Sequence, residues 1–145
     1  ELIEFVPQHG GTALSEPFRY LTNVLKKRCT AFVLSDFMEP EEDRKRFEDA
    51  LKIASGKHDI VGIRVYDRRD AELPDVGIME VQDAETGRKM WIDTSLAALR
   101  DHYRGEWERL SRETASVLNR SWVDNVSVAT DEDYVKALIK LFNRR

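Results

Sequence analysis

Two short apolar runs joined by a helical segment limit, more than any other feature, how this chain can fold. The first run, Ala31 to Leu34, is continuously apolar, and the second is the segment DIVGIRVYD over 59–67. Runs of this kind are typical of strands buried on both faces of a parallel sheet. Between them, residues 39–57 have an acidic first turn, an apolar side and Gly56 near the end, as a helix does. The segments predict a strand–helix–strand unit with a right-handed crossover.

The remaining segments extend this unit into an α/β fold. Apolar spacing and turn residues predict a helix over 13–27, a hairpin with strands 76–82 and 89–93, a helix over 96–119, a strand over 124–129 and a final helix capped by Thr130. Because 145 residues fit one domain, we expect a single domain over 1–145. Its expected architecture is an open, mostly parallel sheet flanked by helices, with an inserted β-hairpin.

The two helices in the C-terminal half have apolar positions at helical spacing. In the long helix, the residues expected to pack inward are Leu99, Tyr103, Trp107, Leu110 and Val117. In the final helix, the expected buried side consists of Tyr134, Val135, Leu138, Ile139 and Phe142.

Composition excludes several classes of protein. The formal net charge of −4 argues against nucleic-acid binding, and no apolar run reaches the roughly 18 residues of a membrane span. The single cysteine, Cys29, cannot form an intramolecular disulfide, which is compatible with a reducing compartment. Cys29 opens a predicted buried strand, where cysteine acts as a small apolar residue, and His58 is expected at the surface. We therefore expect neither a Cys–His nucleophilic pair nor a zinc site.

Polar residues follow each predicted parallel strand, at the end where open α/β sheets bind ligands. They are Ser35-Asp36, Tyr66-Asp67 followed by Arg68 and Arg69, and Thr130-Asp131. Thr12, in HGGTALSE just before the first helix, is expected on the same edge of the sheet. Thr12 and Asp36 together offer two oxygen ligands of the kind that Mg²⁺ takes. The alternative is that Thr12 caps its own helix and Asp36 caps the helix beginning near Pro40.

Four segments carry a resemblance to a known family: GGTALSEPFRYLTNVLKKRCTAFVLSDF, HDIVGIRVYDRRDAELPDVG, DAETGRKMWIDTS and TDEDYVKALIKLF. They resemble the MoxR-associated family with a von Willebrand factor A-like domain, a bacterial domain-of-unknown-function family. The runs 73–77 (LPDVG) and 83–87 (DAETG) are fairly specific to it, and the resemblance covers essentially the whole chain.

The resemblance implies a von Willebrand A-like, Rossmann-like fold with a metal-ion-dependent adhesion site. Such a site combines a D-x-S-x-S motif, a threonine and an aspartate, and Thr12 and Asp36 look like the second and third parts. No D-x-S-x-S occurs in this chain. The resemblance therefore implies the C-terminal portion of the domain, with its N-terminal strands upstream of Glu1. One hydroxyl and one carboxylate are few ligands for a strongly hydrated ion, so we expect Mg²⁺ binding by this chain to be weak or absent.

Two functions of different classes remain open. The resemblance implies a cytoplasmic protein-interaction module, an adaptor or co-chaperone that works with a MoxR-type AAA+ ATPase and a client protein and is not an enzyme. The alternative is a Mg²⁺-dependent hydrolase or phosphoryl-transfer enzyme that uses Asp36 with Asp67 or Asp131. The sequence contains neither a phosphate-binding loop nor a paired nucleophile and base for that chemistry.

The first predicted strand also indicates that the chain self-associates. If 30–35 is the fourth strand of a doubly wound sheet, its neighbour is absent from the chain and one edge of the strand lacks a hydrogen-bonding partner. The strand is apolar up to Asp36, and exposed apolar edges pair with other chains. We therefore expect a homodimer.

Overall fold

A computed structural model describes residues 13–83 and 87–145, and the elements occur in the predicted order. The helices are α1 (Ser15–Val24), α2 (Glu41–Lys57), α3 (Ala97–Arg120) and α4 (Tyr134–Phe142), with a short 3₁₀ turn η1 (Arg68–Asp70). The strands are β1 (Thr30–Ser35), β2 (Asp59–Tyr66), β3 (Ile78–Gln82), β4 (Lys89–Asp93) and β5 (Asp124–Ala129). The predicted α/β class is confirmed.

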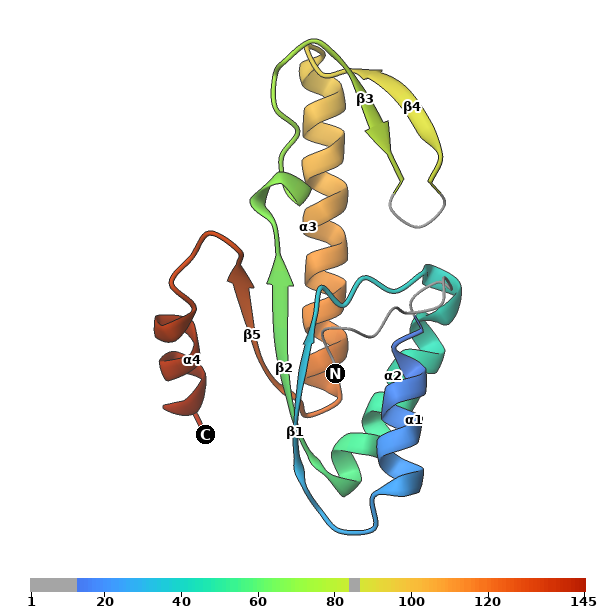
Figure 1. Cartoon of the computed structure of the whole chain (residues 1–145), viewed down its shortest axis with the longest axis vertical. Coiled ribbons are helices and arrows are strands. Elements are labelled where there is room, and N and C mark those ends of the chain that lie inside the picture. Colours follow the sequence, from blue (N-terminus) through green and yellow to red (C-terminus); the bar gives the residue numbers. More distant parts are fainter. Residues whose placement is uncertain (1–12, 84–86) are drawn as a thin grey trace, which may run out of the picture.

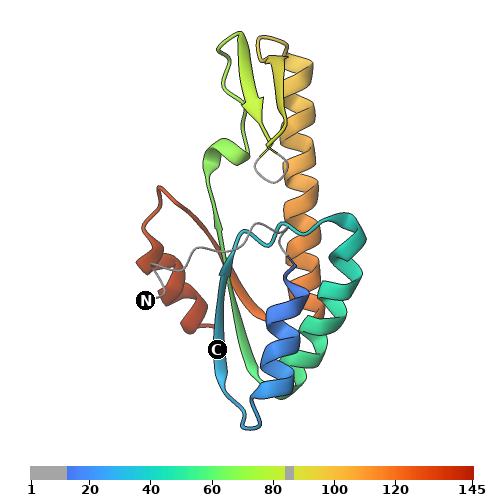
Figure 2. The same cartoon turned by 45° about the vertical axis from the view of Figure 1, so that its right-hand side comes forward.

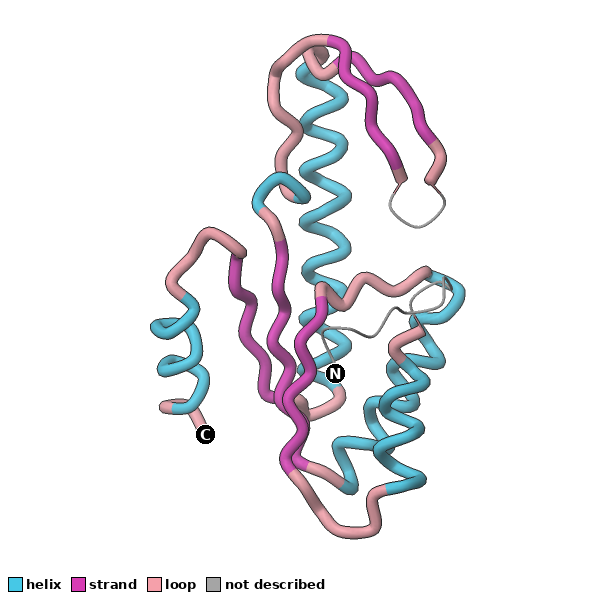
Figure 3. The backbone as a smooth tube through the Cα atoms, viewed as in Figure 1, coloured by secondary structure: helices cyan, strands magenta, loops and turns pink. Residues whose placement is uncertain are grey.

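The main sheet is parallel, in the order β1-β2-β5, and β3 and β4 form a separate antiparallel hairpin (Figure 3). Helices α1, α2 and α3 lie on one side of the sheet and α4 lies on the other (Figures 1 and 2). The carboxyl ends of the three strands therefore meet at one edge. Among the described residues, β1 pairs only with β2, which confirms the predicted unpaired edge.

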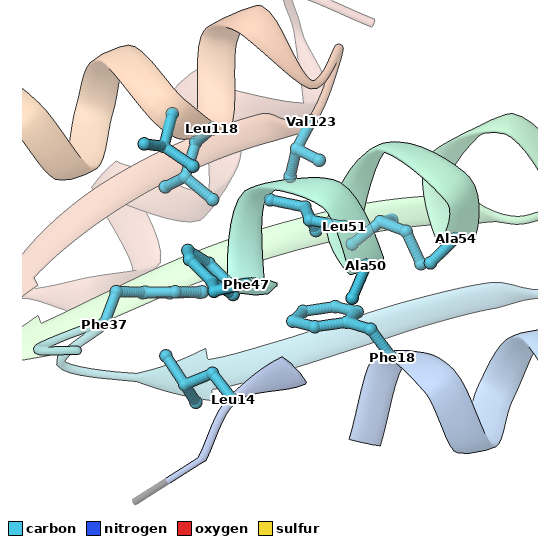
Figure 4. Close-up of a cluster of buried hydrophobic side chains, with 11 residues drawn as sticks. Leu14, Phe18, Phe37, Phe47, Ala50, Leu51, Ala54, Leu118 and Val123 are labelled. Atoms are coloured by element: carbon cyan, nitrogen blue, oxygen red, sulfur yellow. The ribbon is translucent and has the colours of Figure 1, made fainter. Parts of the chain in front are cut away.

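The hydrophobic core lies between the sheet and the first three helices. The ring of Phe47 on α2 lies 5.8 Å from that of Phe18 on α1 and 6.4 Å from that of Phe37, which follows β1 (Figure 4). Leu118 and Val123 close the core from α3 and the start of β5. Helix α1 packs chiefly on α2. The apolar side of α2 therefore contacts both the sheet and α1.

Helix α3 occurs as predicted, but it is longer than the strands of the sheet on which it packs. Its 24 residues make a rod about 36 Å long, whereas the eight residues of β2 span only about 26 Å. Val117 is buried and Trp107 is partly buried, but Tyr103 is exposed. The predicted inward stripe is therefore correct only where the helix lies over the sheet; its N-terminal half extends beyond the sheet beside the hairpin (Figure 1).

Two predictions about burial and one about a helix cap are wrong on the other side of the sheet. Strand β1 is not buried on both faces, since Phe32 is half-exposed and Leu34 is 66% exposed. On α4, four of the five residues expected to be buried are exposed: Tyr134, Val135, Ile139 and Phe142. Helix α4 packs mainly on β5 and turns Leu141 inward, so it leaves the α4-side face of β1 largely uncovered. Its N-cap is Asp133, which accepts from the Val135 N–H, and not Thr130.

An ion-pair network at the surface, in which Glu48 is the most covered member, joins α2 to the end of α3. The Glu48 carboxylate accepts hydrogen bonds from Lys52 Nζ (2.7 Å) and from Arg120 Nη2 (3.3 Å). These bonds lower the pKa of Glu48 from 4.5 to about 2. Because the folded state holds the charged form, this contribution to stability is complete above pH 4.5 and is lost as the pH falls from 4.5 towards 2.

We expect Glu48→Gln to lower the free energy of unfolding by about 1 kcal/mol at pH 7, and this difference to vanish near pH 2. Urea unfolding at several pH values measures it. Glu108→Gln, which removes a carboxylate from an exposed pair with Arg112, is the matched control and should change the free energy of unfolding little at any pH. A Glu48→Gln difference that is the same at pH 7 and pH 2.5 would contradict the assignment.

Candidate functional site at the carboxyl end of the sheet

Asp36 lies immediately after β1, at the edge where the three parallel strands end. Its side chain is exposed, and its Oδ1 accepts from the Met38 N–H (3.1 Å) and from Ser35 Oγ (3.4 Å). The next residue, Phe37, has a positive φ of 55° and carries its ring into the core. Asp36 thus stabilises a tight turn. It does not cap α2, whose N-cap residue is Pro40 and which has no side-chain capping hydrogen bond.

Thr12, the other predicted ligand, lies outside the described residues. Two residues later, the Leu14 N–H donates to both carboxylate oxygens of Glu39 at 3.2 Å. Glu39 is a buried carboxylate in the loop that follows Asp36. This contact brings the start of α1 against the loop after β1. Sequence reasoning did not single out Glu39, because its partner is a backbone amide 25 residues away.

The other predicted strand-end carboxylates have partners of their own. Asp131, after β5, is paired with Arg68 Nε at 2.9 Å, and the neighbouring Glu132 contacts Arg68 Nη2 at 2.5 Å. Asp67, after β2, accepts from the Arg69 N–H and caps η1. Within 13–83 and 87–145, no three His, Cys, Asp or Glu residues gather closely enough to hold a metal ion.

A second polar feature, which sequence reasoning missed, lies beside Asp36. Arg64, inside the apolar run of β2, is only 6% exposed and donates its Nε–H to the backbone oxygen of Asp36 at 3.2 Å. Its guanidinium carbon lies 5.8 Å from the ring centre of Tyr66 and 5.3 Å from that of Trp107. Burial lowers the pKa of Arg64, while Tyr66 and Asp36 oppose that shift. The sequence feature that could have revealed this site is an arginine within an otherwise apolar strand.

Arg64 lines a pocket of about 330 Å³ between the strand ends and α3. The residues around it are Asp36, Met38, Arg64, Tyr66, Asp70, Tyr103, Glu106, Trp107 and Leu110. A neighbouring pocket of about 270 Å³ shares Met38 and Leu110 with it and opens towards Glu39 and Arg44. This edge of the sheet therefore combines an exposed aspartate with a recessed, aromatic-walled cavity.

The opposite end of the sheet holds a contact that the sequence analysis did not anticipate. His58, expected at the surface, is 2% exposed, and its Nδ1 lies 3.5 Å from Cys29 Sγ. Cys29 and His58 precede β1 and β2, and parallel pairing brings them together. The prediction that His58 lies at the surface is therefore wrong, and the fold brings Cys29 and His58 into contact, which the sequence analysis did not expect. Cys29 is only partly buried.

No helix in the described parts of the chain has the length and apolar character needed to cross a membrane.

Comparison with known proteins places the chain in a family. Residues 1–113 match the family described as "Protein of unknown function DUF58". The chain is 30% identical over 122 residues to the uncharacterized protein MAV169 of Mycobacterium avium, covering 83% of this chain and 68% of that protein. The same identity holds for the uncharacterized proteins Mb1516 of Mycobacterium bovis and Rv1480 of Mycobacterium tuberculosis, of which the chain spans only 36%. No solved structure matches the chain. A match over more than two thirds of its length shows that the chain belongs to the DUF58 family.

Proposed function

We propose that this chain is a protein-interaction module, an adaptor or co-chaperone that works with a MoxR-type AAA+ ATPase and a client protein. It carries part of a von Willebrand A-like metal-ion-dependent adhesion site, to which Asp36 and Thr12 contribute. The proposal includes a cytoplasmic location, in keeping with an ATP-dependent partner and a single free cysteine.

The position of Asp36 is the observation that carries this proposal. The carboxylate is exposed at the carboxyl end of a parallel strand, where α/β folds bind their ligands. The Leu14–Glu39 contact brings the start of α1 to the same loop. Asp36 Oδ1 accepts the hydrogen bonds that hold its turn, whereas its Oδ2 accepts none from the part of the chain that the structure describes. That oxygen is the atom that a metal ion or a partner's donor would contact.

The enzymatic alternative has less support. A hydrolase working through Asp36 needs a second carboxylate free to act as a base or to hold Mg²⁺. Asp131 is engaged by Arg68, and Asp67 by the backbone of η1. We therefore propose binding and not catalysis.

We expect Asp36→Asn to lose at least about tenfold in binding to a purified MoxR-type ATPase from the same organism, since it removes one charged contact. Asparagine keeps the oxygen that accepts from the Met38 N–H, so the turn should persist. A pull-down with the immobilised 145-residue chain, quantified by surface plasmon resonance, measures the loss. Repeating it with Mg²⁺ and with a chelator tests whether a metal takes part.

Asp49→Asn is the matched control, because Asp49 is an exposed aspartate on α2 in a pair with Lys45. It should bind like the unmodified chain. Calorimetry of the chain with Mg²⁺ alone should show weak binding or none. Equal ATPase binding by the Asp36→Asn and Asp49→Asn variants would refute the role of Asp36, and no binding by the unmodified chain would refute the proposed partner.

A further inference from the structure

Arg64 is a buried cation that has no ion-pair partner among residues 13–83 and 87–145. Its guanidinium has five N–H donors, of which the described part of the chain engages only the Nε–H, through the backbone oxygen of Asp36. No carboxylate in the described residues is in ion-pair contact with it, although Asp36 is near enough to act on its charge. Arg64 as a residue is only 6% exposed, so burial removes part of the hydration of its charge, and no carboxylate among the described residues is paired with it in return.

Packing against the aromatic rings fixes the position of the Arg64 guanidinium, but it does not provide hydrogen-bond acceptors for the Nη hydrogens. Tyr66 and Trp107, whose ring centres lie 5.4 Å apart, flank the guanidinium and restrict its motion. Ring faces attract a cation but do not satisfy the four Nη hydrogens. Arg64 is one of the residues that line the 330 Å³ pocket, at the strand ends where ligands enter α/β folds.

The carboxylates that line this pocket contact other groups, and none of them is ion-paired with Arg64 within the described residues. Asp36 accepts from the Met38 N–H, Asp70 accepts from the Asp67 N–H at 3.1 Å, and Glu106 is paired with Arg109 at 3.0 Å. Each stabilises its own turn or helix.

We propose that this pocket binds a single carboxylate attached to an apolar or aromatic body, with the Arg64 guanidinium as its receptor. The planar fork of arginine matches the two oxygens of a carboxylate. The remaining walls, formed by Tyr103, Trp107, Leu110 and Met38, suit an apolar body. The carboxylate comes either from a free organic acid or from the end of a polypeptide. This inference requires neither a metal nor an ATPase and stands independently of the proposed function.

Nuclear magnetic resonance titration of the unmodified chain with three ligands of the same shape tests the proposal. They are phenylacetate, its neutral amide phenylacetamide, and the cation phenethylamine. We expect only phenylacetate to shift the Arg64 Nε–H and the Trp107 indole N–H in a saturable way. The amide should bind at least about tenfold more weakly, since it lacks the charge that pairs with arginine.

Two substitutions locate the receptor. Arg64→Met keeps the volume of the side chain and should abolish the response to phenylacetate. Arg64→Lys keeps the charge without the fork and should weaken binding by about tenfold. Arg68→Met is the control, because Arg68 is an exposed arginine four residues away that contacts Asp131 and Glu132 outside the pocket. It should bind phenylacetate like the unmodified chain.

The possible results of the titration either support or refute the proposal. Equal binding of acid and amide, tighter binding of the amine, or no response to any ligand by the unmodified chain refutes the proposal whether or not the variants fold. A short peptide ending in phenylalanine, with a free or an amidated C-terminus, distinguishes the sources. If the free-acid peptide binds more tightly than phenylacetate, the carboxylate is that of a polypeptide; if it binds more weakly, the ligand is a small acid.

Discussion

Phe47→Ala is expected to lower the free energy of unfolding by about 3–5 kcal/mol, a large share of what a domain of this size has. Phe47 is 2% exposed and is the side chain through which α1, α2 and the loop after β1 meet. Alanine would leave a cavity between the rings of Phe18 and Phe37, whose centres lie 5.8 and 6.4 Å from that of Phe47. Both ring contacts would be lost along with the buried area.

Urea unfolding followed by circular dichroism measures this loss. The control is Ile53→Ala on the same helix, since Ile53 is 56% exposed and its truncation should cost less than about 0.5 kcal/mol. A loss below 1 kcal/mol for Phe47→Ala would mean that α1 does not pack on α2 in solution as it does here.

The second large effect concerns the state of association. We expect the isolated chain to self-associate through an apolar surface formed by Phe32 and Leu34 of β1 and by Val135, Ile139 and Phe142 of α4. The rings of Phe32 and Phe142, centred 6.2 Å apart, join the two parts of this surface. It adjoins the edge of β1 that lacks a strand partner among the described residues. Pairing of two such edges about a two-fold axis would cover both.

Light scattering should therefore give twice the chain mass of 16.8 kDa. Leu34→Glu should shift the chain towards monomer, with a dissociation constant raised about tenfold or more, because association would bury an unpaired charge. Ile53→Glu introduces the same charge at an exposed apolar position on α2, outside this surface, and should leave the dimer intact. A mass of 16.8 kDa at every concentration for the unmodified chain would refute the prediction.

Much of the fold could be predicted from local patterns. The strand over 124–129 has the predicted bounds, and the other elements begin or end within about three residues of those predicted. Helix α2 ends at Lys57 as predicted and begins at Glu41, two residues after the predicted start. These predictions succeed because the periodic spacing of apolar residues within each segment indicates whether the segment is a helix or a strand.

The candidate site could be predicted only in part. Asp36 lies at the carboxyl end of its strand as expected, because the end of an apolar run is visible in sequence. The proposed partnership of Asp36 with Thr12 stays a prediction, since Thr12 lies outside the described residues. Glu39 and the Arg64 pocket were missed, because each depends on contacts between segments that are remote in the chain.

The sequence by itself determined which segments are helices and strands, their order, and the parallel strand–helix–strand unit, because apolar spacing and turn residues act over a few neighbours. Only the tertiary structure decided which apolar residues are covered. Helix α4 is apolar on more than one side, so its periodicity could not say that Leu141 turns inward while Ile139 stays exposed. Likewise, the pairing of β1 with β2 buried His58 and brought it to Cys29. Burial depends on which element packs opposite, and that partner is set by the whole fold.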